Sequence, residues 1–255
     1  TAPVGLNQWT FQTATYDSIN RNAFYKDGSL NATSLFAYVS CATQGSTPDF
    51  VIGNIAVNGA YGFIGNQSEV VLFGEELPSV RRILVDNYLS AKYDIALSAN
   101  DVYDGDTNGN GDFDLDVAGI GQFGGNKHTQ AFGAGMIVVD NSFLNDDGDW
   151  LLFGHNTAVN AKSSDVPTGG DWTGAPNPMR WARNWYIDVT DANNDGGTVD
   201  IVFDFSEAGM NGGQPPSGPA SNYRLLKRSD PMLPFTDIAT ATAVAGDQVH
   251  FQNVD

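Results

Sequence analysis

The sequence predicts an all-β protein of the β-sandwich type with one short helix at about residues 78–93. Short runs of alternating apolar and polar residues recur along the chain and are separated by turn residues. Glycine is abundant, at 29 of 255 residues, and Asp, Asn, Ser and Thr are frequent. This composition is typical of many short strands joined by tight turns. Such strands imply two packed sheets.

The expected strands fall into two groups along the chain. In the first group they lie within residues 8–25 and at 34–40, 50–57 and 65–73, with a hairpin turn at Lys26–Ser29. In the second group they lie at 117–121, 135–139, 150–153, 181–189, 198–205, 223–227 and 249–254. The acidic stretch between the groups, residues 101–116, predicts a junction between two domains.

One segment has helical periodicity instead. Val80, Ile83, Leu84 and Tyr88 repeat at the spacing of one helix face. Pro78 stands at the first turn, where a missing N–H costs no hydrogen bond. We therefore expect a helix that begins near Pro78 and ends near residue 93.

The charge of the chain is strongly negative. Thirty acidic residues face twelve Lys and Arg, which gives a net charge of −18. Nucleic acid is excluded as a partner because no basic stripe exists to neutralise phosphates. No apolar run approaches the roughly 20 residues that a membrane span needs. No signal peptide begins at Thr1, so we expect a cytosolic chain, a processed one or a fragment.

The junction carries the strongest local signal for a ligand. Oxygen-bearing side chains occupy alternate positions, at Asp104, Asp106, Asn108, Asn110, Asp112, Asp114 and Asp116. Alternate oxygen ligands let one loop wrap Ca²⁺, and the intervening glycines allow sharp turns. The position of the last EF-hand ligand holds Leu115 or Val117 instead of Glu, so a calcium loop of the dockerin or thrombospondin-repeat kind fits better. A metal-free acidic turn is the alternative.

Signals for catalysis are weak throughout the sequence. There is no Glu-x-Asp-x-Glu strand of the glycosidase kind, no paired His for zinc, and no nucleophile elbow or phosphate loop. We therefore expect a protein that is not an enzyme.

Trp172, in a Gly-rich loop, is the best candidate for an exposed contact with a sugar ring.

Residues 8–93 resemble the C-terminal half of a laminin-G-like, concanavalin A-like jelly roll. The resemblance rests on Gln8–Phe11, on Ala23–Gly28, on Phe63–Val70 and on the helix opening at Glu75–Pro78 and closing at Tyr88–Tyr93. Similar segments occur in very large bacterial surface proteins, often marine. In those proteins a second β domain often follows, and the segments Val117–Gly121, Gly148–Asn156, Arg180–Trp185 and Tyr223–Leu226 resemble it.

The resemblance implies an incomplete jelly roll, because strands expected before Trp9 are missing. The chain is then either an excised piece or a subunit whose jelly roll a neighbouring chain completes. It also implies a partial jelly roll at 1–100 and a second β-sandwich at 117–255, on either side of the acidic, calcium-type loop at 101–116.

Three functions remain open after this reading. The first is a secreted, extracellular structural or adhesive module of a bacterial cell surface, stabilised by Ca²⁺. The second is a carbohydrate-binding, lectin-like module, and the third is a subunit of a self-assembling filament or surface layer. The expected partners are glycans, other surface proteins or further copies of this chain.

Overall fold

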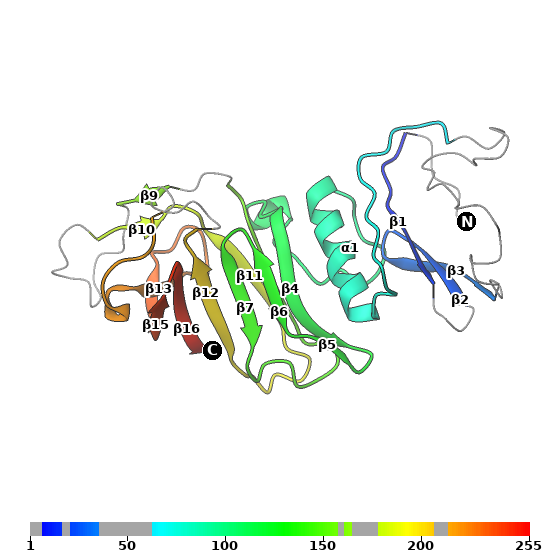
Figure 1. The fold of residues 1–255 in the computed structure, drawn as a ribbon. Coiled ribbons are helices and arrows are strands. Elements are labelled where there is room, and N and C mark those ends of the chain that lie inside the picture. Colours follow the sequence, from blue (N-terminus) through cyan, green and yellow to red (C-terminus); the bar gives the residue numbers. More distant parts are fainter. Residues whose placement is uncertain (1–6, 17–20, 36–62, 158–160, 165–177, 207–213) are drawn as a thin grey trace, which may run out of the picture.

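A computed structural model describes residues 7–16, 21–35, 63–157, 161–164, 178–206 and 214–255 (Figure 1). These residues form antiparallel sheets and one α-helix, so the predicted all-β fold with a single short helix is confirmed. Trp172 and the expected strand at 50–57 lie outside the described residues, as does most of the one at 34–40.

The elements follow one another in this order: β1 (Gln12–Tyr16), β2 (Arg21–Lys26), β3 (Ser29–Leu35), α1 (Ser79–Tyr93), the 3₁₀ turn η2 (Asn108–Asn110), β4 (Leu115–Phe123), β5 (Asn126–His128), β6 (Gln130–Gly133), β7 (Met136–Asp140), β8 (Trp150–His155), β9 (Lys162–Ser163), β10 (Arg180–Trp181), β11 (Trp185–Thr190), β12 (Val199–Asp204), η4 (Ala220–Asn222), β13 (Arg224–Lys227), β14 (Thr236–Thr240), β15 (Ala243–Ala245) and β16 (Gln248–Val254).

The C-terminal half forms a β-sandwich. One sheet has the order β11-β8-β4-β5 and the other the order β15-β16-β12-β7-β6, with antiparallel pairing throughout both. Ile120, Val138, Phe153 and Ile201 fill the space between the sheets and are nearly inaccessible to solvent. Burial of such side chains is the main force that holds two sheets together.

Strand β8 is buried on both faces, and α1 supplies the cover on the outer face. Because successive side chains of a strand point to opposite faces, Leu151 and Phe153 join the core between the sheets. Trp150 and Leu152 point the other way and pack in a second cluster with α1, including Ile83. This explains why all six residues of β8 are buried. Figure 1 shows α1 between the sandwich and the N-terminal sheet.

The N-terminal sheet, β1-β2-β3, is fastened to the opposite side of α1. Arg82 and Asp86 form a buried ion pair at 2.5 Å, one helical turn apart. The Arg82 guanidinium also lies 3.9 Å from the centre of the Tyr25 ring on β2. The Thr13 hydroxyl on β1 donates to Asp86 at 3.4 Å. The helix therefore contacts both halves of the chain, and the domain boundary near residue 100 stays a prediction.

Several local predictions can now be compared with the structure. The helix extends over Ser79–Tyr93, as predicted, and it ends where Asp94 adopts a left-handed backbone with φ of 51°. The turn at Lys26–Ser29 is confirmed, with positive φ at Asp27 and Gly28. Six of the seven strands expected in the second half each have a single counterpart.

Two predictions about strands are wrong. Residues 65–73 form no strand, although their apolar and β-branched residues favour one, because no neighbouring segment among the described residues forms a ladder with them. The expected strand at 181–189 is interrupted: Trp181 belongs to β10 and Trp185 to β11, in separate sheets. Their rings nevertheless meet edge to face, with centroids 5.0 Å apart.

Candidate functional site

The acidic junction is held on the sandwich by aromatic side chains. Tyr103 is almost completely buried, and its hydroxyl donates to the carbonyl of Phe113 at 2.7 Å, which ties the two ends of the loop together. The Tyr186 ring on β11 packs against both Tyr103 and Phe113. Gly154 on β8 lies beneath the loop, where a Cβ atom would come within 2.5 Å of the Phe113 carbonyl oxygen. The loop is therefore a packed part of the fold.

Hydrogen bonds within the loop close it around one carbonyl group. The carbonyl of Asp104 accepts from the side chains of Thr107 at 3.0 Å and Asn110 at 2.7 Å. It also accepts from the backbone N–H of Thr107. The backbone N–H of Asp104 donates to the Asp188 carboxylate at 2.6 Å. Asp188 lies on β11, so the loop is fixed to a strand that is distant in sequence.

Four carboxylates gather at this place, and we call Asp101, Asp104, Asp106 and Asp188 the acidic cluster. Burial raises the pKa of Asp106 to about 6, and the negative charges of Asp101, Asp104 and Asp94 contribute to the rise. Burial and the charges of Asp104 and Asp188 raise the pKa of Asp101. Burial also raises the pKa of Asp188. At neutral pH the folded protein thus holds like charges together against their mutual repulsion.

The predicted calcium ligands separate into two groups in the structure. Asp104 and Asp106 belong to the acidic cluster, whereas Asn108 and Asn110 form the 3₁₀ turn η2. Asp112, exposed, and Asp114, half-buried, form no side-chain hydrogen bond among the described residues. Within the described part of the chain, no three His, Cys, Asp or Glu side chains converge on a point that could hold a metal ion.

Asp116 has a different partner from the rest of the loop. Its carboxylate lies 2.8 Å from Nε2 of His155, a side chain that is almost fully buried at the end of β8. The other ring nitrogen of His155 lies 2.8 Å from the carbonyl of Thr157. Asp116 therefore anchors the end of the loop to β8, and a cation at the acidic cluster would leave this contact in place.

Sequence reasoning missed Asp188. Within its strand it is the one charged residue among mostly apolar ones, which is the ordinary pattern of a half-exposed strand. Only the register of β11 on β8, with Asp188 opposite Leu152, brings it to the junction. No local signal in the sequence could have identified it.

Two weaker acidic motifs, at residues 146–149 and 191–196, are turns closed by their own carboxylates. Asp149 is buried and accepts from the backbone N–H groups of Asn145, Asp146 and Ala192. Asp191 accepts from the backbone N–H groups of Asn193, Asp195 and Gly196, and these bonds lower its pKa. Both carboxylates stabilise turns, as Asp commonly does.

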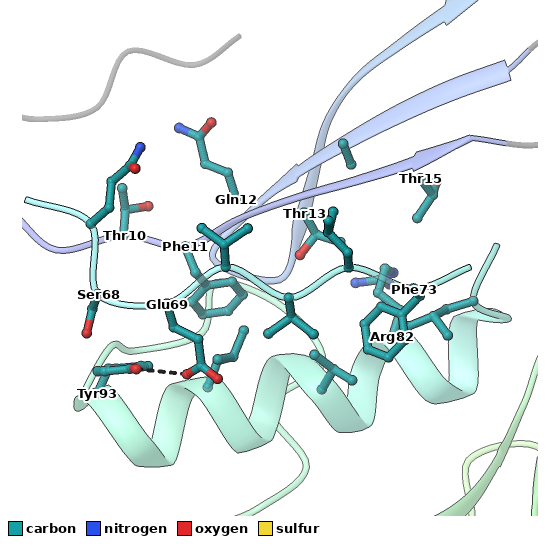
Figure 2. Close-up of a pocket in the computed structure, with 18 of the residues that line it drawn as sticks. Thr10, Phe11, Gln12, Thr13, Thr15, Ser68, Glu69, Phe73, Arg82 and Tyr93 are labelled. Carbon is teal, nitrogen blue, oxygen red and sulfur yellow. Dashed lines mark hydrogen bonds between the residues drawn. The ribbon is translucent and has the colours of Figure 1, made fainter. Parts of the chain in front are cut away.

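A groove of about 740 Å³ lies on the other side of α1. Its walls are β1, the preceding residues 8–11, the extended segment 66–77 and one face of α1 (Figure 2). At one end Glu69 accepts from Tyr93 at 2.8 Å and from Lys92 at 2.9 Å. These bonds, together with the charge of Lys92, lower the pKa of Glu69.

Comparison with protein-family models, curated proteins and solved structures found no match to this chain. Among the described residues, none of the helices combines the length and the apolar character needed to cross a membrane.

Proposed function

We propose that this chain is an extracellular structural or adhesive module whose junction at residues 101–116 is stiffened by Ca²⁺. The observation that supports the proposal is the acidic cluster at the packed junction. Carboxylates with raised pKa values are held together by the fold, and a divalent cation would relieve their repulsion.

The proposed ion needs a modest rearrangement of the loop. Asp104 and Asp106 are the two predicted ligands already at the cluster, and Asp188 and Asp101 would complete an oxygen-rich shell with backbone carbonyls. Asp188 now accepts the backbone N–H of Asp104, and the Asp104 carbonyl is already occupied by donors within the loop. Turning these groups towards an ion would couple binding to loop geometry.

The mechanical role follows from where the cluster lies. The loop connects the region of α1 to β4, and α1 contacts the N-terminal sheet through Arg82 and Asp86. An ion that bridges the loop to β11 would fix the start of the sandwich relative to the helix. A rigid joint of this kind suits a chain of β modules that transmits force or holds a binding surface at a distance. We propose no catalytic role and place the protein outside the cell.

Calorimetric titration with Ca²⁺ tests the proposal. We expect saturable heat of binding at one site in the wild type. In Asp188→Asn the dissociation constant for Ca²⁺ should rise at least about tenfold, because one charged ligand is lost. Asp247→Asn is the matched control, since it removes the same charge from an exposed turn between β15 and β16. Saturable binding that is equal in all three proteins would place the ion elsewhere, and no binding in any would refute the proposal.

A further inference from the structure

The extended segment beside the groove carries an uncovered apolar surface. Its members are large apolar side chains that border the groove and are about half exposed or more; we call Trp9, Phe63, Val70, Val71, Leu72 and Phe73 the apolar strip. Leu72 is 69% exposed and Trp9 60%. Four of the six are consecutive, so neither face of the extended segment is fully covered.

The backbone of this segment is also unpaired. Within the described part of the chain, residues 65–73 make no backbone hydrogen bond to another segment. Among the described strands, the neighbouring strand β1 pairs with β2 on one side and has no partner on the other. Figure 2 shows the segment running past Ser68 and Phe73 between β1 and α1. Exposed apolar side chains on an unpaired extended backbone are the features by which strands recruit other strands.

The size of the strip is that of an interface. Six large side chains exposed by about half or more present roughly 600 Å² of apolar surface. This is the top of the range for the largest apolar patch on a typical monomer, about 300–600 Å², and patches of this size are often functional. With its polar rim of Gln67 and Ser68, the strip approaches the roughly 800 Å² that each partner contributes to a stable complex.

We propose that the apolar strip is the contact surface between two copies of this chain, paired antiparallel about a two-fold axis. The strip itself bears no charge, and two of the three acids at its ends, Glu69 and Glu75, are neutralised within the protomer. Glu69 is paired with Lys92 at 2.9 Å, and Glu75 with Arg81 at 3.1 Å. Within the described part of the chain, Glu76 alone of these three acids, which is exposed at one end, has no ion-pair partner, so a surface that is otherwise neutral fits the strip best.

The register of such a pair avoids repulsion between like charges. Centring the antiparallel pair on Val71 places Glu69 opposite Phe73 of the partner subunit. The same register places Gln67 opposite Glu75 of the partner subunit, so an amide meets a carboxylate. A two-fold contact uses the same patch on both copies and closes on itself, so it yields dimers. The net charge of −18 on each copy opposes association, which should therefore tighten as salt screens the charge.

Sedimentation equilibrium in chelator, at concentrations up to about 100 µM and at low and high NaCl, tests this proposal. We expect a reversible dimer in the wild type, tighter at high salt. Leu72→Asp should raise the dimer dissociation constant at least about 100-fold, because each copy then buries a charge opposite Val70 of the partner subunit, and the two new charges lie diagonally across the axis. Met232→Asp is the control, because Met232 is equally apolar, 91% exposed and located between β13 and β14, away from the strip.

The possible results separate this proposal from that of calcium binding. A wild type that stays monomeric at every concentration, or a Leu72→Asp variant that dimerises like the wild type, would overturn the strip as the interface. Open-ended growth beyond dimers would overturn the two-fold geometry. The same series in Ca²⁺ should give the same dimer, since no carboxylate of the acidic cluster belongs to the strip. Dimerisation that appears only with Ca²⁺ would contradict the assignment of the apolar strip as the dimer interface.

Discussion

Replacing Asp106 with Asn should stabilise the protein when Ca²⁺ is absent. The folded state raises the pKa of this carboxyl from 3.8 to about 6. Between about pH 4 and pH 6 the folded state keeps a proton that the unfolded chain has lost, so the free energy of unfolding falls as pH rises through this range. Above about pH 6 the proton is lost from both states, so the free energy of unfolding stays at its lower value and no longer changes with pH on account of Asp106.

The magnitude follows from the same pKa values. At about 1.4 kcal/mol for each pH unit, a rise from 3.8 to about 6 corresponds to about 3 kcal/mol. Asp106 is only half-buried, so solvent screening reduces the expected effect to about 1.5 kcal/mol. Asn cannot ionise, and Asp106→Asn should therefore recover this amount at neutral pH and almost nothing near pH 4.

Urea unfolding in chelator at about pH 4 and about pH 7.5 measures the difference. Asp247→Asn, which removes the same charge from an exposed turn, should change stability by less than about 0.5 kcal/mol at both pH values. The reasoning is refuted when Asp106→Asn leaves stability unchanged or lowers it at pH 7.5. In saturating Ca²⁺ the wild type should instead be more stable than Asp106→Asn, because the wild type keeps the full set of ligands.

Three further predictions concern the packing around the helix and the junction. Arg82→Ala should destabilise the protein by about 3 kcal/mol in urea unfolding, because it leaves Asp86 buried without its ion pair. Arg81→Ala removes the neighbouring but exposed Arg, and it should cost less than about 1 kcal/mol in the same assay. Gly154→Ala should lower the melting temperature and weaken Ca²⁺ binding, since its Cβ would press on the Phe113 carbonyl; Gly109→Ala, with no atom within 4 Å of its Cβ, should do neither. Asp86→Asn should weaken the dependence of stability on pH between about 4 and 6, because burial raises the pKa of Asp86 to about 6; an unchanged pH profile, measured by urea unfolding, would contradict this.

Local patterns were sufficient to predict α1. Its apolar residues repeat at a single period, and Pro78 marks its start, so the information lies within the segment itself. The strands of the sandwich are predictable for a similar reason, because alternation reports which face is buried. β8 differs from the other strands of the sandwich because both of its faces are apolar. Only the packing of α1 on the sheet explains why the outer face is buried.

The failures arise where a result depends on a distant partner. Residues 65–73 have the composition of a strand, but a strand exists only when another segment accepts its hydrogen bonds. The acidic cluster could be predicted in part, because Asp104 and Asp106 stand in a recognisable loop. Asp188 could not, since its place depends on the register of β11 against β8. The division of Asp116 from the other acids likewise depends on His155, which lies on another strand.

Thermal unfolding of the wild type in Ca²⁺ and in chelator tests the central claim most directly. An ion that binds only the folded state at about 100 times its dissociation constant adds about 2.7 kcal/mol, which for a chain of this size raises the melting temperature by roughly 5–10 °C. We predict a rise of this size, greatly reduced in Asp188→Asn and retained in Asp247→Asn. An identical melting temperature with and without Ca²⁺ would contradict a calcium-stiffened junction and leave residues 101–116 as a metal-free acidic connection.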